Sequence, residues 1–152
     1  MALSVRDATP ADADRVAELS AEFVAYLRAL GDPEPQGITA HAFRRDGFGP
    51  DAAFASLVAE AADRIVGYLL CHPGYDVDRG GRVLHIIDLY VATDARRCGV
   101  GRALMAAAGE VCRRAGACAL VWSVYPPNTV ARAFYERLGA RYSEDLLMSW
   151  RP

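Results

Sequence analysis

The chain contains no lysine: all 17 of its basic residues are arginines, they are set against 19 acids, and the formal net charge is −2. This near balance argues against a protein that binds nucleic acid or an anionic membrane through its overall charge. Long apolar runs are also missing, since stretches such as Ala117–Trp122 fall far short of the ~20 residues that span a bilayer. We therefore expect no nucleic-acid partner and no membrane partner.

Cysteine and histidine are scarce and scattered. Cys71, Cys98, Cys112 and Cys118 show neither the paired C-x-x-C spacing of a zinc site nor a dense disulfide framework, and the three histidines form no cluster. The first residues lack the basic region and apolar run of a signal peptide. We expect reduced thiols, no metal and a cytoplasmic location.

Apolar residues make up 53% of the 152 residues, enough for one domain over residues 1–152 with its own core. Hydrophobic periodicity, caps and breakers predict strands and helices in mixed order, with a loop at Pro73–Gly81. The predicted strands are Leu3–Arg6, Phe54–Glu60, Ile65–His72, Val83–Val91, Cys118–Tyr125 and Leu146–Trp150, and the helices lie within Thr9–Gly31, His41–Arg45, Gly99–Gly116 and Thr129–Leu138. This order indicates an α/β fold with a mixed central sheet of about six to seven strands and about four helices.

The most informative stretch is Leu89–Arg102, where an apolar strand passes through a short turn into a helix. Gly99 and Gly101 let a ligand approach the backbone, and the first N–H groups of a helix have no intrahelical partner. With the helix dipole, these groups form an anion site. Three arginines add charge that suits a pyrophosphate: Arg96, Arg97 and Arg102. The alternative is an ordinary strand-to-helix turn with solvated arginines.

Other phosphate-binding motifs fit this stretch less well. A dinucleotide fingerprint needs a third glycine where Leu104 stands, and a P-loop needs a lysine where Arg102 stands. A nucleic-acid-binding domain could use the arginine cluster, but the acidic net charge speaks against it.

The run Arg96-x-x-Gly99-x-Gly101 resembles the acyl-CoA pyrophosphate motif of the GNAT superfamily of N-acetyltransferases. The segment Asn128-x-x-Ala131-x-x-Phe134-Tyr135-x-x-Leu138-Gly139-Ala140 resembles the closing motif of that superfamily. The order of elements is similar over nearly the whole chain. The resemblance implies the GNAT fold, acetyl-CoA as co-substrate, and direct transfer of the acetyl group to a primary amine in a ternary complex.

The resemblance also implies where the co-substrate binds. In this superfamily the fourth strand splays from the fifth, and the pantetheine arm pairs with its backbone like an added strand. The matching positions here are Leu89, Tyr90 and Val91, whose main chain would also polarise the acetyl carbonyl. The pyrophosphate would lie on the amides of Arg97, Cys98, Gly99, Val100, Gly101 and Arg102. Asn128 matches a position that contacts the cofactor or orients an active-site group.

Tyr135 matches the tyrosine that often protonates the departing thiolate. A phenol with a pKa of ~10 stays protonated at neutral pH, and a thiol of ~8.5 leaves as a weaker base. Spacing alone allows a different interpretation, in which Tyr135 is one member of the apolar stripe that contains Ala131, Phe134 and Leu138. With the family pattern, we expect it near the cofactor.

Asp88 is the candidate base, because a carboxylate inside the apolar run Val83–Val91 is unfavourable unless it is paired or functional. A water relay or a structural role for Asp88, capping a loop, are the alternatives. Relatives that acetylate polyamines carry Glu then Asp here, whereas this chain has Ile87 then Asp88. That departure weighs against a polyamine acceptor.

The acceptor itself stays open among small amines, aminoglycosides, amino acids and peptide N-termini. Segments that flank the acceptor cleft in relatives contain Tyr26, Asp32, Glu34, Tyr75 and Asp76. Two residues on the strand after the long helix are further candidates for the acceptor side: Trp122 and Ser123. Dimerisation is common in the superfamily, so a homodimer is one expectation. A non-catalytic acyl-CoA-binding or sensor module is the alternative function.

Overall fold

The computed structural model describes residues 2–152 of the chain. Its strands are β1 (Leu3–Asp7), β2 (Ala55–Ala61), β3 (Arg64–Asp76), β4 (Gly81–Val91) and β5 (Ala119–Val121). Its α-helices are α1 (Ala13–Ala29), α2 (Ala40–Asp46), α3 (Val100–Arg114) and α4 (Thr129–Arg137). Within residues 2–152, none of the helices is both long and apolar enough to cross a membrane.

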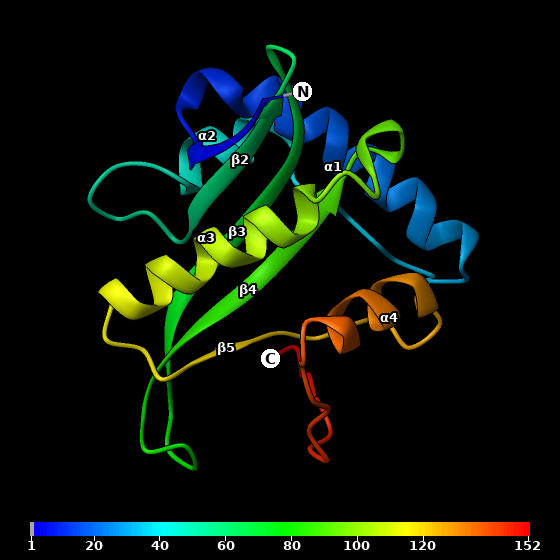
Figure 1. Cartoon of the computed structure of the whole chain (residues 1–152). Coiled ribbons are helices and arrows are strands. Elements are labelled where there is room, and N and C mark those ends of the chain that lie inside the picture. The colour runs from blue at the N-terminus through cyan, green and yellow to red at the C-terminus, as the bar shows by residue number, and fades with distance from the viewer. Residues whose placement is uncertain (1) are drawn as a thin grey trace.

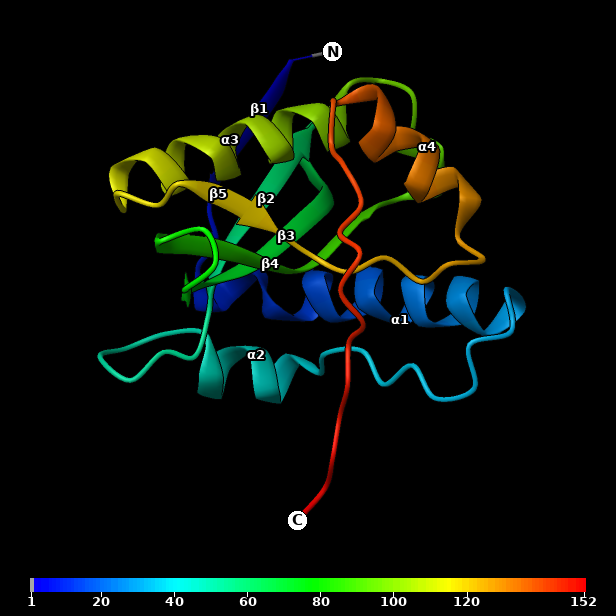
Figure 2. The ribbon, with the colours of Figure 1, turned by 90° about the horizontal axis from the view of Figure 1, so that it is seen from below.

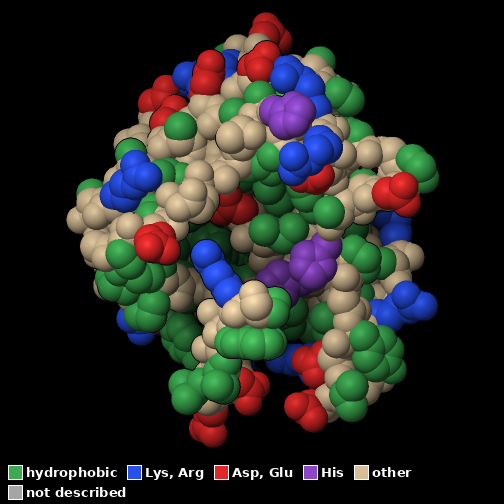
Figure 3. All heavy atoms as spheres, turned by 180° about the vertical axis from the view of Figure 1, so that it is seen from behind, with side chains coloured by type: hydrophobic (Ala, Val, Ile, Leu, Met, Phe, Trp, Pro, Cys, Tyr) green, Lys and Arg blue, Asp and Glu red, His purple; other side chains and the backbone are tan. Residues whose placement is uncertain are grey.

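The five strands form one mixed sheet in the order β1-β2-β3-β4-β5. Neighbouring strands are antiparallel from β1 to β4, and β5 runs parallel to β4. Helices α1 and α2 cover one face of the sheet and α3 lies across the other (Figures 1 and 2). The core lies in these two interfaces, and basic and acidic side chains are interspersed over the face seen in Figure 3.

The start of α1 is fixed by a buried carboxylate. Asp12 accepts hydrogen bonds from the Thr9 N–H at 2.7 Å and from the Thr9 hydroxyl at 3.1 Å, and the first of these bonds is one half of a capping box. The guanidinium of Arg6 on β1 donates to both oxygens of Asp12, at 2.8 and 3.0 Å. These bonds lower the pKa of Asp12 to about 2 and join the first strand to the first helix.

Strand β4 contains a bulge. Asp88 stands opposite Leu70 on β3, whereas Ile86 stands opposite the next residue, Cys71. Ile87 is therefore the extra residue, and a bulge of this kind bends a strand and changes the direction of its side chains. Beyond the bulge, Asp88 and Tyr90 point to the face that α1 covers, where Asp88 meets Tyr68 and Tyr90 meets Phe23.

The mixed sheet and the four α-helices confirm the predicted architecture, but the strand number is wrong. The segment Leu146–Trp150 was expected to be a strand, yet it pairs with no part of residues 2–152, and the exposed fractions of Leu146, Leu147, Met148 and Trp150 lie between 84% and 89%. A strand forms only when another strand supplies its hydrogen-bond partners, and none lies beside this segment.

Two further boundaries differ from the prediction. Of the expected strand Cys118–Tyr125, only Ala119–Val121 pairs with β4. The expected loop Pro73–Gly81 is largely a hairpin, because β3 and β4 continue their pairing as far as Asp76 and Gly81. Gly and Asp in that stretch indicated a loop, but the turn itself is confined to residues 77–80.

Candidate active site

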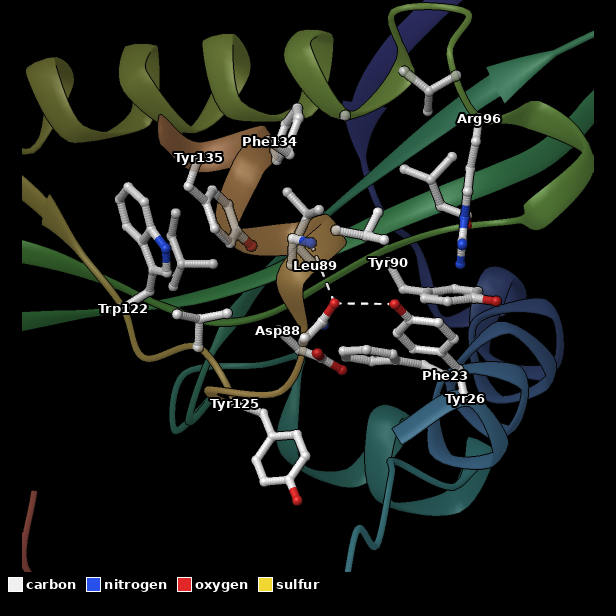
Figure 4. Close-up of a pocket in the computed structure, with 18 of the residues that line it drawn as sticks. Phe23, Tyr26, Asp88, Leu89, Tyr90, Arg96, Trp122, Tyr125, Phe134 and Tyr135 are labelled. Atoms are coloured by element: carbon white, nitrogen blue, oxygen red, sulfur yellow. Dashed lines mark hydrogen bonds between the residues drawn. The ribbon is translucent and has the colours of Figure 1, made fainter. Parts of the chain in front are cut away.

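The two parallel strands of the sheet separate and leave an opening. Strand β5 pairs with β4 only between Ala119–Val121 and Val83–His85, while β4 continues to Val91. A cavity of about 820 Å³ occupies this opening, between β4, the C-terminal half of α1, the start of α3 and α4 (Figure 4). All three residues expected to hold the pantetheine arm line it: Leu89, Tyr90 and Val91.

The main chain of β4 presents hydrogen-bonding groups to this cavity. The N–H of Ala92 donates to Val66 of β3 at 2.8 Å, and successive residues of a strand point to opposite sides, so Leu89 and Val91 face the open side. Of their four groups, the Val91 carbonyl accepts from Arg96 Nε at 3.0 Å, and the Leu89 N–H lies beside the Asp88 carboxylate and lowers its pKa. The Leu89 carbonyl and the Val91 N–H remain for a ligand.

The N-terminus of α3 opens onto the same cavity. Gly99, with φ of +82°, ends the turn in the left-handed region, and apart from its chain neighbours no other described residue has a heavy atom within 4 Å of where its Cβ would be. Gly101 permits a close approach of α4, because a Cβ there would lie 3.1 Å from Phe134 Cζ. The free amides of the first turn therefore lie at an open surface, the arrangement that binds anions.

The charges around this turn divide into two groups. Arg97 and Arg102 line the cavity beside the first turn of α3, so amides and guanidinium groups together fit a pyrophosphate. Arg96 also lines the cavity, but its guanidinium carbon lies 5.4 Å from the ring centre of Tyr26 and 5.3 Å from that of Tyr90. Cys98 is exposed and is not one of the lining residues in the described part of the chain.

Asn128 links two walls of the cavity. Its side-chain oxygen accepts from the Ala131 N–H at 3.2 Å, which caps α4, and from the Tyr26 hydroxyl at 3.0 Å. Tyr26 belongs to α1, so this nearly buried amide ties α1 to α4 across the cavity. Both roles expected for Asn128, contact with the cofactor and orientation of an active-site group, stay predictions.

Asp88 lies on the floor of the cavity, and the Tyr68 hydroxyl donates to its Oδ2 at 2.6 Å. Burial raises the pKa of Asp88 to about 6, and the hydrogen bonds from Tyr68 and the Leu89 N–H oppose part of this rise. A carboxylate with such a pKa exchanges protons near neutral pH.

Tyr135 enters the cavity from α4, against Trp122, with the two ring centres 4.9 Å apart. Its side chain points toward the same region as that of Asp88 (Figure 4). Burial, and then the negative charge of Asp88, raise the pKa of Tyr135 to about 12, so it is a protonated phenol at neutral pH. One titratable carboxyl and one phenol therefore share this space.

Sequence reasoning missed Tyr68 and included residues that lie elsewhere. Tyr68 is fully buried, and its signal was a single hydroxyl inside the apolar run Ile65–His72. His85 stacks on His72 with ring centres 5.0 Å apart, and neither is among the described residues that line the cavity. Tyr75 and Asp76 lie near the hairpin turn, away from the cavity lining.

Comparisons with known proteins agree with this geometry. The model of the acetyltransferase (GNAT) family matches residues 16–140. The chain is 30% identical to thialysine N-epsilon-acetyltransferase of Bos taurus over 90% of this chain and 83% of that protein. An aminoglycoside acetyltransferase from an uncultured soil metagenomic sample is 25% identical with a TM-score of 0.72, covering 100% of this chain and 99% of that chain.

A mutant of the BH1408 protein from Bacillus halodurans has the same fold, with a TM-score of 0.81, 24% identity, and coverage of 98% of this chain and 99% of that chain. The family match spans the separated strands, the α3 turn and the α4 segment on which the sequence resemblance rested. From the cavity and these matches together, we conclude that the chain is an acetyl-transferring enzyme of the acetyltransferase (GNAT) family, with its α/β fold.

Proposed function

We propose that this enzyme transfers the acetyl group of acetyl-CoA to a primary amine by direct attack, with both substrates bound together. The observation that carries the proposal is the shared space of Asp88 and Tyr135, between the open edge of β4 and the start of α3. A base and an acid in one cavity are what the transfer needs, because the amine loses a proton and the thiolate gains one.

Acetyl-CoA supplies the acetyl group as an activated thioester. The Leu89 carbonyl and the Val91 N–H are positioned to pair with the pantetheine amides as a neighbouring strand would. The amides of Gly99–Arg102, with the side chains of Arg97 and Arg102, bind the pyrophosphate. The acetyl carbonyl then lies beside the main chain of residues 89–91, which we expect to polarise it.

Asp88 takes the proton of the attacking amine, directly or through one water. An amine with a pKa of ~10.4 is less than about 0.1% neutral at pH 7, so a base raises the reactive fraction. The pKa of about 6 leaves Asp88 mostly ionised at pH 7 and more basic than an ordinary carboxylate. We expect activity to fall as the pH drops below about 6.

Tyr135 returns a proton to the thiolate. With its pKa at about 12, transfer to a thiolate whose conjugate thiol has a pKa of ~8.5 is uphill by about 3.5 units while Asp88 is charged. Part of that rise comes from the charge on Asp88, so protonation of Asp88 by the amine makes Tyr135 a stronger acid. The first proton transfer thus assists the second.

The lining of the cavity favours an amine with one positive charge on an apolar stem. Among the described lining residues, Asp88 is the one with a carboxylate, and Ile87 is half-exposed beside it. Phe23, Tyr26 and Trp122 supply aromatic walls. This chemistry suits a lysine-type side chain better than a polyamine, in line with the thialysine acetyltransferase resemblance.

A thiol-release assay with acetyl-CoA and a panel of amines tests the proposal. The panel contains thialysine, lysine, a diamine, an aminoglycoside and a short peptide. We expect the highest kcat/KM for the lysine-type amines. A preference for the diamine or the aminoglycoside would overturn the acceptor class. Tight CoA binding with no release for any amine would favour a non-catalytic acyl-CoA-binding module instead.

Two substitutions test the assigned roles. Asp88→Asn should lower kcat by about 10²–10⁴-fold and remove the acidic limb of the pH–rate profile. Tyr135→Phe should lower kcat with little change in the KM for acetyl-CoA. If Tyr135→Phe keeps full kcat at every pH, Tyr135 is not the acid. The homodimer and the cytoplasmic location stay predictions.

A further inference from the structure

Behind Asp88 lies a chain of hydrogen bonds that extends away from the cavity. Ser20 on α1 is 1% exposed, and its Oγ accepts from the main-chain N–H of Ile38 at 2.9 Å. The Ser20 hydroxyl also faces the hydroxyl of the fully buried Tyr68, and this contact lowers the pKa of the Tyr68 phenol. Tyr68 in turn donates to Asp88 Oδ2 at 2.6 Å. Three elements, α1, β3 and β4, thus contribute one group each.

The direction of this chain is fixed by the chemistry of its members. A main-chain N–H can only donate, so the Ser20 oxygen accepts from Ile38 and its own hydrogen is free for Tyr68. The Tyr68 oxygen is available to accept that hydrogen, because the single hydrogen of Tyr68 goes to the carboxylate. Every donor therefore points toward Asp88, and neighbouring hydrogen bonds in such a chain strengthen one another.

The loop after α1 packs tightly at the far end of the chain. Gly37 has a φ of +69°, and a Cβ there would lie 2.9 Å from Ser20 Oγ and 2.8 Å from Val24 Cγ2. The main chain of residues 37 and 38 is thus held directly against Ser20. The position of the hydroxyl that orients Tyr68 depends on this loop.

Other groups around Asp88 do not take the place of Tyr68. Tyr135 faces Asp88 from α4. Tyr90, two residues after Asp88 on β4, directs its hydroxyl to Glu22 of α1 at 3.5 Å. Arg96 lies over the ring of Tyr90 and donates its Nε to Val91. Within residues 2–152 no arginine forms an ion pair with Asp88, so neutral donors alone hold the carboxylate.

We infer that Tyr68, oriented by Ser20, is a positioning residue that holds the Asp88 carboxylate in place for the acetyl transfer and stabilises its ionised form. The inference rests on the proposed function, in which Asp88 is the base. The donor occupies one lone pair of Oδ2, which leaves acceptor capacity on the carboxylate for the amine proton. Tyr68 itself touches neither substrate, because it is fully buried.

Tyr68→Phe removes the donor and keeps the ring. A hydrogen bond to a charged group favours the charged form, so its loss should raise the Asp88 pKa by about one pH unit. Carboxyl ¹³C NMR of aspartate-labelled protein measures this midpoint, with Asp88→Asn identifying the signal. The acidic limb of kcat/KM should move up by the same amount, and the KM for acetyl-CoA should stay unchanged. Ser20→Ala should give a smaller shift in the same direction.

Ser56→Ala is the matched control, since it removes a nearly buried hydroxyl from β2 and should leave both readouts at the wild-type values. An Asp88 midpoint that stays unchanged in folded Tyr68→Phe overturns the inference. If the Asp88 midpoint moves in Tyr68→Phe but the acidic limb of kcat/KM does not, Tyr68 does not act on the reaction through Asp88. An acidic limb that survives in Asp88→Asn contradicts the proposed base itself, and the NMR midpoint separates this failure from the others.

Discussion

At the scale of single residues, the buried charge of Asp88 lowers the stability of the fold, but the same burial makes its carboxylate a stronger base. Burial makes its charged form unfavourable, and its compensation is two neutral donors rather than a cation. Carboxylates in such surroundings are typical of catalytic sites, because the raised pKa that destabilises the folded protein makes the group a better base.

The first prediction concerns stability at this residue. The folded protein binds a proton at Asp88 more tightly than the unfolded chain does, because its pKa rises to about 6 from an ordinary value of about 4. Stability therefore falls as the pH rises from about 4 to about 6 and stays lower above it. A difference of two pKa units between the folded and unfolded states corresponds to roughly 3 kcal/mol in the free energy of unfolding. We expect Asp88→Asn to raise the free energy of unfolding by up to that amount at pH 8.

Urea unfolding at several pH values measures this effect. Below pH 4 the wild type and Asp88→Asn should be equally stable, since the carboxyl is then neutral in both the folded and unfolded states. Equal stability at pH 8 would contradict the assigned burial of the charge.

The second prediction concerns Ile87, the half-exposed bulge residue next to Asp88. Ile87→Glu places a second carboxylate at the cavity, and a second positive charge on the acceptor then gains a partner. We expect the ratio of kcat/KM for a diamine over lysine to rise about tenfold. Ile87→Gln is the control, because it is polar and of similar length but uncharged. A rise of equal size in Ile87→Gln would show that polarity rather than charge decides the preference.

At the scale of elements, helix starts were readable from sequence because the signals are local. Thr9, Pro10 and Asp12 predicted the start of α1, and Gly99 predicted that of α3. The terminal segment Leu146–Trp150 shows the opposite case. Its apolar composition fits a strand, but strand formation depends on a distant partner that local composition does not reveal.

The third prediction tests the start of α1. Asp12→Ala removes the bonds to Thr9 and Arg6, and we expect it to lower the free energy of unfolding by about 1–2 kcal/mol. Asp14→Ala, on the exposed side of the same turn, removes a surface ion pair with Arg44 and should change stability by less than about 0.5 kcal/mol. Thermal or urea unfolding compares the two. Equal losses would show that the capping box contributes nothing beyond a surface charge.

At the scale of the whole molecule, the cavity joins parts of the chain that are far apart in sequence. The proposed acetyl-CoA site uses β4, the first turn of α3 and α4, and the bond from Tyr26 to Asn128 adds α1. A ligand that contacts several elements stabilises their common folded arrangement.

The fourth prediction follows from this arrangement. CoA at 100 times its Kd should stabilise the folded protein by about 2.7 kcal/mol and raise the Tm by roughly 5–10 °C. Arg102→Glu, at the start of α3, should abolish most of that rise by repelling the pyrophosphate. Arg113→Glu, the same change at the exposed other end of α3, should preserve it. An equal loss of the Tm rise in both variants would show that the net charge of the protein, and not a site at the start of α3, decides CoA binding.

The α/β class, the helix starts, the glycine-containing turn before α3 and the family could be predicted from the amino-acid sequence, because each depends on residues close together in the chain. Tertiary structure alone decided the bulge at Ile87, the number of strands, the bond from Tyr26 to Asn128 and the contact between Tyr68 and Asp88. The physical reason is that pairing register and buried hydrogen bonds join residues 20 to 102 positions apart, and their energies depend on the packed neighbours, which no local pattern encodes.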